Sequence, residues 1–235
     1  IQLVKTMIAR YPNDFELALT TDDIERIHAA GRIASLIGVE GGHCIEESLG
    51  NLRNLHRLGA RYMTLTHNDT LSWADSATDD ARNEGLNEFG REVIRHMNTL
   101  GMLIDLSHVS DQTMHDVLDE SKAPVIFSHS SARAVADVGR NVPDDVLLRI
   151  KQLDGVVMVN FYSGFLIPEA VEIYKERIAI GRRLRDKVEK PEIDRQVAKF
   201  LSENPMPRGS IHDVLDHIEH IAKVAGAERV GIGSD

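Results

Sequence analysis

The sequence predicts an α/β fold, and specifically a (β/α)8 barrel of which the 235 residues contain about six strands. Three observations support this prediction. Short apolar runs alternate six times with helical segments, which indicates a parallel sheet with right-handed crossovers. Each run ends in a polar side chain, as expected at a barrel rim, where active sites draw residues from many strand ends. No Gly-x-Gly-x-x-Gly motif follows an early strand, so the alternative, a doubly wound dinucleotide-binding sheet, has no support.

Six segments are expected to be strands because each is a short apolar run bounded by turn or helix-start signals. The clearest is 103–107, which lies between Gly101 and the helix-start pair Ser110-Asp111. Parallel strands deliver their final side chains to one end of the sheet. The runs and the polar residues that follow them are 36–39 with Glu40, 62–66 with His67, 103–107 with His108, 124–128 with His129, 156–159 with Asn160, and 230–234 with Asp235.

Helices are expected between these strands because capping residues precede, and glycines follow, the intervening segments. Asn87 is expected to cap a helix over 88–100, and Ser210 with Asp213 matches a capping box before a helix that ends at Gly226. The other predicted helices are 1–8, 21–31, 46–58, 110–121 and 143–155, the last with Pro143 at its first position.

We expect a single barrel domain over 1–235, truncated at its N-terminal side and at its C-terminal side. Six strands do not close an eight-stranded barrel, so the two missing strands are expected before Ile1. Two segments interrupt the alternation. The polar loop 68–86 is long enough to be functional or mobile. The charged helical insertion 167–209 is interpreted as a solvated excursion or a subunit contact.

Composition excludes several classes of function. A net charge of −10 argues against nucleic-acid binding, which needs a basic face, and an aromatic content of 5% argues against base stacking. No run of about 18 apolar residues is present, so no transmembrane segment is expected in this stretch. The single cysteine, Cys44, cannot form a disulfide within it, which fits a reducing compartment but leaves localisation open.

Three strand ends carry side chains that suit a divalent metal: Glu40, His108 and His129. Imidazole and carboxylate groups together favour zinc and related ions. The two oxygens of Glu40 could bridge two ions about 3.5–4 Å apart, as two-metal hydrolase sites require. A lone histidine at a strand end is more often a packing or capping residue, but three matching strand ends favour a shared metal site.

Three further residues are candidates for substrate chemistry. Asp235 could be a metal ligand or a general base on a metal-bound water, or simply the N-cap of a following helix. His67 could donate to a developing oxyanion, or be an ordinary loop histidine. Arg140, in the loop after the His129 strand, could clamp a substrate carboxylate with two hydrogen bonds, or form a surface salt bridge.

Other residues of the same chemical types receive structural interpretations. His217 and His220 lie three apart on a predicted helix, a spacing that can hold a metal, but their acidic neighbours indicate a solvated helix face. Cys44 follows the turn at 40–43 and could be mistaken for a nucleophile. Because no paired base is evident, a buried packing role is expected for it.

Six motifs, spread over almost the whole chain, share their order and spacing with one known family. They are Gly-Val-Glu-Gly-Gly-His at 38–43, Leu-Thr-His-Asn at 65–68, Asp-Leu-Ser-His-Val-Ser at 105–110, Ser-His-Ser at 128–130, Gly-Arg-Asn at 139–141 and Gly-Ser-Asp at 233–235. In this set the sequence resembles the membrane (renal) dipeptidase family of metal-dependent amidohydrolase-like barrels. The helical insertion 167–209 is outside the resemblance.

The resemblance implies a (β/α)8 hydrolase with two zinc ions. Glu40 would bridge both ions, and His108 and His129 would complete the second. His67 would contact the substrate and stabilise the tetrahedral intermediate, Arg140 would hold the C-terminal carboxylate of the dipeptide, and Asp235 would shuttle the proton beside a bridging hydroxide. The family's first metal also needs a His-x-Asp after the first strand, and the sequence places no such motif correctly.

We therefore expect a zinc-dependent dipeptidase acting on dipeptides with a free C-terminal carboxylate, with a D-residue at the second position also accepted, as often in the family. One alternative is another binuclear amidohydrolase, acting on a lactone, a phosphoester or a deamination substrate. The other is a non-catalytic barrel without the first metal. The expected partner is the dipeptide, and a homodimer is left open.

Overall fold

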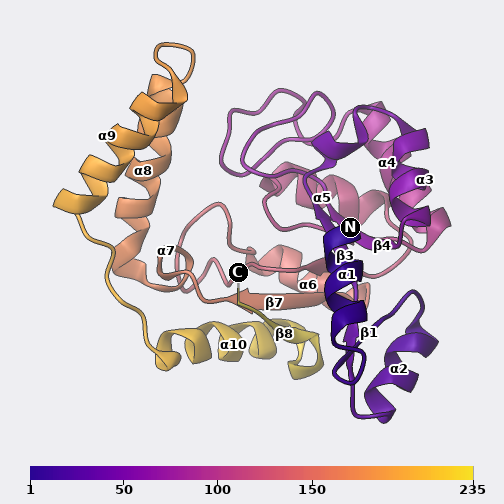
Figure 1. Cartoon of the computed structure of the whole chain (residues 1–235). Helices are drawn as coiled ribbons and strands as arrows, with labels where there is room; N and C mark the ends of the chain where they lie inside the picture. The colour runs from indigo at the N-terminus through magenta and orange to yellow at the C-terminus, as the bar shows by residue number, and fades with distance from the viewer. Residues whose placement is uncertain (235) are drawn as a thin grey trace.

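Six parallel strands form a curved sheet in which spatial order follows chain order (Figure 1). The computed structural model describes residues 1–234. Among the described strands the order does not reverse, as in part of a barrel rather than in a doubly wound sheet. The strands are β3 (Ile37–Glu40), β4 (Ala60–Thr64), β5 (Leu103–Asp105), β6 (Val125–Phe127), β7 (Val156–Asn160) and β8 (Val230–Ser234). They correspond to the six predicted strands.

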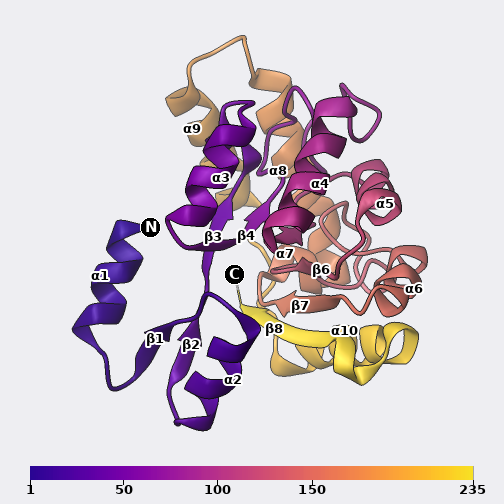
Figure 2. The same cartoon turned by 90° about the vertical axis from the view of Figure 1, so that its right-hand side faces the viewer.

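Helices follow the strands and cover the outer face of the sheet (Figure 2). Consecutive helices contact one another and so form a continuous layer. Apolar side chains are fully buried between the layers, among them Leu52 and Ile94 from helices and Phe127 from a strand. None of the helices in residues 1–234 is both long and apolar enough to cross a membrane. The covering helices are α3 (Leu49–Arg57), α4 (Glu88–Leu100), α5 (Asp111–Glu120), α6 (Asp144–Gln152) and α10 (Ile211–Ala225).

The predicted caps hold most of these helices at their predicted ends. Asn87 accepts a hydrogen bond from the backbone of Gly90, and Gly101 closes α4 with φ at 68°. This left-handed conformation favours glycine. The capping box of Ser210 and Asp213 is present at the start of α10. Side-chain caps of this kind satisfy backbone N–H groups that the first helical turn leaves open.

Two helix starts differ from the prediction. The segment 46–58 does not begin as a helix, because Glu46 and Glu47 take positive φ angles of 49° and 53° after a 3-10 turn, Gly42–Ile45. The helix begins instead at Leu49, capped by Ser48. Pro143 is the N-cap of α6 rather than its first helical residue.

The N-terminal region contains a small sheet that the sequence did not predict. The strands β1 (Phe15–Leu17) and β2 (Ile33–Ser35) pair in parallel, connected by α2 (Thr21–Ala29) and preceded by α1 (Gln2–Arg10). Each strand has three residues, too few to show an alternating pattern. This unit lies beside the β3 edge of the main sheet, opposite the projecting helices α8 and α9 (Figure 2).

The insertion forms a projecting pair of helices after β7 and the short α7 (Ser163–Leu166), namely α8 (Val171–Leu184) and α9 (Lys190–Glu203) (Figure 1). The pair is tied to the loop 68–86: Arg182 Nε donates to Thr78 O at 2.9 Å, and Arg185 donates to Asp79 Oδ1 at 2.5 Å. The helix α8 also buries Val171, Tyr174 and Ile180. The interpretation as a merely solvated excursion is therefore wrong for α8, whereas α9 buries no residue.

Candidate metal centre and its cleft

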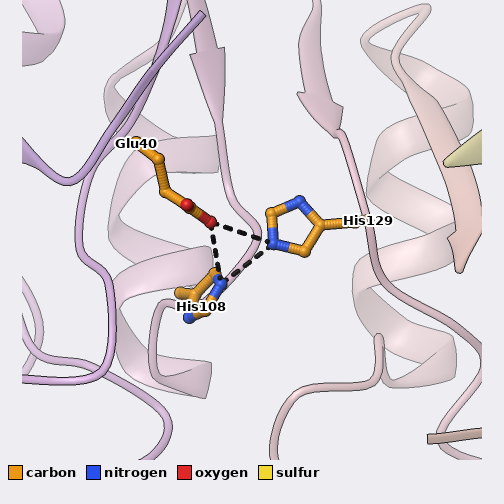
Figure 3. A group of neighbouring side chains, drawn as sticks. All are labelled: Glu40, His108 and His129. Carbon is orange, nitrogen blue, oxygen red and sulfur yellow. Dashed lines mark hydrogen bonds and ion pairs between the residues drawn. The ribbon is translucent and has the colours of Figure 1, made fainter. Parts of the chain in front are cut away.

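Three predicted ligands from three strand ends meet at one point (Figure 3). Glu40 is the last residue of β3, whereas His108 and His129 follow β5 and β6. Glu40 Oε1 lies 3.3 Å from His108 Nε2 and 3.4 Å from His129 Nε2. The two Nε2 atoms are 2.9 Å apart. The parallel sheet thus brings together side chains that are as far apart in sequence as residues 40 and 129, a separation of 89 positions.

These distances fit a shared cation. With zinc–ligand bonds of about 2.0–2.1 Å, neighbouring donors of a tetrahedral site lie about 3.3 Å apart. The contacts of 2.9–3.4 Å between Glu40, His108 and His129 are close to that spacing. Two imidazole nitrogens that face one carboxylate oxygen are also the borderline ligands that zinc prefers. The three residues could therefore hold one ion, and Oε2 of Glu40 remains for another.

The backbone at His108 is shaped for this position. Its φ angle is 74°, a left-handed conformation that non-glycine residues rarely adopt and that clusters at functional sites. Its carbonyl accepts the N–H of Ala77 at 2.8 Å, which anchors the turn to the loop 68–86. Burial, followed by the positive charge of Arg140, lowers the pKa of His108 far below its usual value. The ring is therefore neutral at pH 7, as a metal ligand must be.

A buried carboxylate orients His129. Ser128 Oγ donates to Asp105 Oδ2 at 2.5 Å, and His129 Nδ1 lies 2.7 Å from the same Ser128 oxygen. Because the serine proton points to the carboxylate, the serine oxygen accepts from Nδ1–H. The Nε2 lone pair then points toward Glu40 and His108, as metal ligation requires.

Asp105 itself is fully buried, and its two oxygens accept four hydrogen bonds. The donors are Thr64 Oγ1, Ser128 Oγ and the backbone N–H groups of Ser107 and Ser128. Asp105 was not among the predicted site residues. Its place in the motif at 105–110 was visible, but Thr64 and Ser128 lie 41 and 23 positions away and are known as partners only from the fold.

A cleft of about 490 Å³ opens beside Glu40 and His108, between the strand ends and the helical pair. We call it the main cleft. The ring of His67, which is exposed, lies 4.6 Å from that of His108 and faces this space. The lining residues that concern the site are Glu40, His67, His108, Arg140, Tyr174 and Arg177.

Arg140 is buried, with 2% of its surface exposed, and reaches the main cleft. Its Nη2 donates to the backbone carbonyl of His129 at 3.4 Å. Its Cζ lies 5.1 Å from the centre of the Phe165 ring, within cation–π range. Arg140 is therefore not the surface ion pair considered as the alternative. The structure brings it and His67 to the candidate metal ligands, and Asp235 lies outside the described residues.

A family model for "Membrane dipeptidase (Peptidase family M19)" matches residues 1–235. The chain belongs to the membrane dipeptidase family. Two uncharacterized dipeptidases of Schizosaccharomyces pombe, C3A11.10c and C965.12, are 41% and 43% identical to it over 237 and 239 residues. Each alignment covers all of this chain and 49% of the relative, so the chain spans about half the length of these proteins.

Solved structures of membrane dipeptidase family members and related hydrolases share the fold. The probable dipeptidase PvdM of Pseudomonas aeruginosa matches with a TM-score of 0.86 at 23% identity, covering all of this chain and 65% of that one. A metallo peptidase of Rhodobacter sphaeroides, solved with a phosphinate mimic of the dipeptide L-Ala-D-Ala, matches with a TM-score of 0.77 at 25% identity, covering 100% and 59%. The barrel prediction is confirmed.

Two structural interpretations of this membrane dipeptidase family chain need correction. His217 is fully buried rather than on a solvated face, because Ala132 N donates to its Nδ1 at 2.9 Å and its Nε2 lies 3.0 Å from Leu166 O. Both ring nitrogens are thus used within the protein. Cys44 is exposed rather than buried, and its Sγ lies 3.5 Å from Nε2 of His43.

Proposed function

We propose that this protein is a zinc-dependent dipeptidase that hydrolyses dipeptides with a free C-terminal carboxylate. The observation that supports the proposal most directly is the meeting of Glu40, His108 and His129 at one point. Two of them, Glu40 and His108, line the main cleft together with Arg140. Membership of the membrane dipeptidase family supports the same activity. The main cleft is also closed on one side by the helical pair, which favours short substrates.

Two zinc ions are proposed; the carboxylate of Glu40 would contribute to holding both, and His108 and His129 would hold one of them. Zinc lowers the pKa of a coordinated water and polarises a scissile carbonyl when it is bound at such a site. The buried ring of His108 is neutral and presents its lone pair without first losing a proton, and the ring of His129 is oriented by Ser128. These features orient the two rings for metal binding before an ion is bound.

The remaining roles belong to side chains that face the substrate. Arg140 is already positioned by Phe165 and the His129 carbonyl, so it can bind the α-carboxylate of the dipeptide with two parallel hydrogen bonds. His67 is proposed to donate to the oxygen on which negative charge develops. Asp235 is proposed to take a proton from the attacking water and return it to the leaving amine, an assignment that rests on its place directly after β8.

A D-residue at the second position of the substrate is part of the proposal. The related metallo peptidase of Rhodobacter sphaeroides was solved with a mimic of L-Ala-D-Ala, and its structure covers all of this chain. Comparison of kcat/KM for L-Ala-D-Ala and L-Ala-L-Ala tests this point, and hydrolysis of the L,L-substrate alone would contradict it.

The carboxylate clamp is tested with Arg140→Ala in the full-length, zinc-loaded protein. Loss of a charged hydrogen-bonding partner should lower kcat/KM for a dipeptide by about 10- to 100-fold. The C-terminal amide of the same dipeptide should be a poor substrate for the wild type and should lose little in the variant. Arg149→Ala, which removes an arginine that pairs with Asp119 on the surface, is the matched control.

Equal losses on the dipeptide and its amide would rule out the clamp. Turnover of a lactone or phosphoester without any need for an α-carboxylate would favour another amidohydrolase activity on the same metal pair. Less than one zinc per chain, together with no turnover, would favour a non-catalytic barrel.

A further inference from the structure

The main cleft contains a guanidinium group that the proposed reaction does not use. Arg177 lies on α8, is half-buried, and lines the cleft together with Arg140. Two other arginines of α8, Arg182 and Arg185, also line it, but both donate hydrogen bonds to the loop 68–86. Arg177 makes no hydrogen bond or ion pair with any residue of the described range 1–234.

Arg177 and Arg140 lie near the same pair of packed aromatic rings, Phe165 and Tyr174, which we call the aromatic wall. Tyr174 lies one helical turn before Arg177 and packs on Phe165, with ring centroids 5.1 Å apart. Arg140 lies over the same Phe165 ring. Burial raises the pKa of Tyr174 to about 12, although the positive charges of Arg140 and Arg177 both oppose the rise. Both guanidinium groups also line the main cleft, so they face the same space as the Tyr174 ring.

A partly desolvated guanidinium that has no carboxylate partner in residues 1–234 is suited to a carboxylate that arrives with the substrate. We propose that Arg177 forms a second carboxylate subsite beside Arg140, which selects dipeptides with Asp or Glu at the C-terminal position. This inference rests on the proposed function, in which Arg140 binds the α-carboxylate. The side chain of the same substrate residue then extends toward the neighbouring guanidinium.

Asp194 of α9 offers a competing explanation, because its carboxylate is exposed and also lines the main cleft. If it paired with Arg177 in solution, Arg177 would only hold α8 to α9. Within the described residues, however, no carboxylate oxygen lies within 4.0 Å of an Arg177 nitrogen. If the pair only tethered α8 to α9, Asp194→Asn and Arg177→Gln would lower the stability of the protein equally. Neither change would then affect the preference for acidic substrates. A subsite predicts that Asp194→Asn keeps or strengthens the preference for acidic substrates.

The test compares kcat/KM for Ala-Asp and Ala-Asn, which differ in charge but hardly in shape, in the zinc-loaded, full-length protein. We expect the ratio to exceed about tenfold in the wild type and to fall close to one in Arg177→Gln. Arg177→Lys should keep part of the preference, because it keeps the charge but not the planar fork. Arg183→Gln, which removes an exposed arginine of the same helix that pairs with Glu176, should leave the ratio unchanged.

A ratio near one in the wild type, or the same ratio in the wild type and Arg177→Gln, would overturn the subsite. Failure to hydrolyse any dipeptide would reject the proposed function instead. The subsite is then decided by calorimetric titration of the zinc-loaded protein with phosphinate mimics of Ala-Asp and Ala-Asn. Tighter binding of the Asp mimic that disappears in Arg177→Gln supports it, and equal binding of the two mimics overturns it.

Discussion

Asp105 orients a candidate metal ligand, His129, through Ser128. It is a fully buried carboxylate whose hydrogen bonds join β4, β5 and β6 just below the ligands. Through Ser128 it places the ring proton of His129 on Nδ1. Partners of this kind orient ligating histidines, and their loss typically weakens metal affinity by about 10- to 100-fold.

Asp105→Asn should therefore lower zinc affinity by about 10- to 100-fold. The asparagine amide has one oxygen where the carboxylate has two, so Ser128 Oγ can lose its acceptor. Ser128 can then donate to His129 Nδ1, which moves the ring proton to Nε2. Zinc affinity is measured by competition with a chelator, and the tautomer by the ring nitrogen resonances of His129. Asp119→Asn, which changes an exposed carboxylate paired with Arg149, is the control. Unchanged affinity and an unchanged tautomer would show that Asp105 only supports the fold.

His217 provides a prediction about stability rather than chemistry. Replacement by Ala leaves the backbone N–H of Ala132 and the carbonyl of Leu166 without their ring partner and opens a cavity. We expect the free energy of unfolding to fall by about 2–4 kcal/mol, measured by urea denaturation, with zinc affinity unchanged. His220→Ala, on the same helix but paired with Asp144 near the surface, should cost less than about 1 kcal/mol. A large loss of zinc affinity in His217→Ala would contradict the structural role.

Among the helices and strands, the features that depend on neighbouring residues in the chain were predictable from the sequence. The caps Asn87, Ser110 and Ser210 start their helices where expected, and the strands deliver Glu40 and His129 to one rim. Features that depend on distant partners were not predictable. His217 is buried with hydrogen-bonding partners from the loop after β6 and from the end of α7, although its sequence neighbours are acidic. The same holds for the strands β1 and β2, which are too short to show a pattern.

The C-terminal part of the loop 68–86 is held by the carboxylate of Asp75. Asp75 is 1% exposed and accepts hydrogen bonds from the backbone of Arg82, Asn83 and Gly85. Burial alone would raise the pKa of Asp75, but the hydrogen bonds from Gly85, Arg82 and Asn83 outweigh it, and the pKa is lowered. The folded loop thus favours the charged form.

This shift gives the loop a pH dependence. The Asp75 carboxylate stabilises the folded loop fully at any pH above the pKa of the group in the unfolded chain, which is about 4. This stabilisation is lost as the pH falls through the lower pKa of the group in the folded loop. The protection factors of the loop amides, which correct hydrogen exchange for its intrinsic pH dependence, should therefore be high at neutral pH and should fall below about pH 4. Asp75→Asn should speed exchange at neutral pH and weaken the pH dependence. Asp80→Asn, a change to a solvent-exposed carboxylate, is the control, and equal effects of both changes would contradict the role of Asp75.

At the scale of the whole molecule, the ligands connect parts of the sheet that are distant in sequence. Glu40 ends β3, and the two histidines follow β5 and β6, so an ion bound to all three would fasten one edge of the sheet to its middle. An ion that binds only the folded state stabilises it by mass action, by about 4 kcal/mol at a concentration 1,000 times its dissociation constant. Zinc should therefore act on the fold as well as on the reaction.

Removal of the metal from the full-length protein with a chelator should lower the thermal midpoint by several degrees, and addition of zinc should restore it. Glu40→Gln removes a charged ligand that touches both histidines, so its midpoint should respond much less to zinc than that of the wild type. Glu47→Gln changes a nearby acidic residue on the same connection and should respond as the wild type does. If the wild type and Glu40→Gln gain equally from zinc, the stabilising ion binds elsewhere, and the convergence of Glu40, His108 and His129 would have to be explained by hydrogen bonding alone.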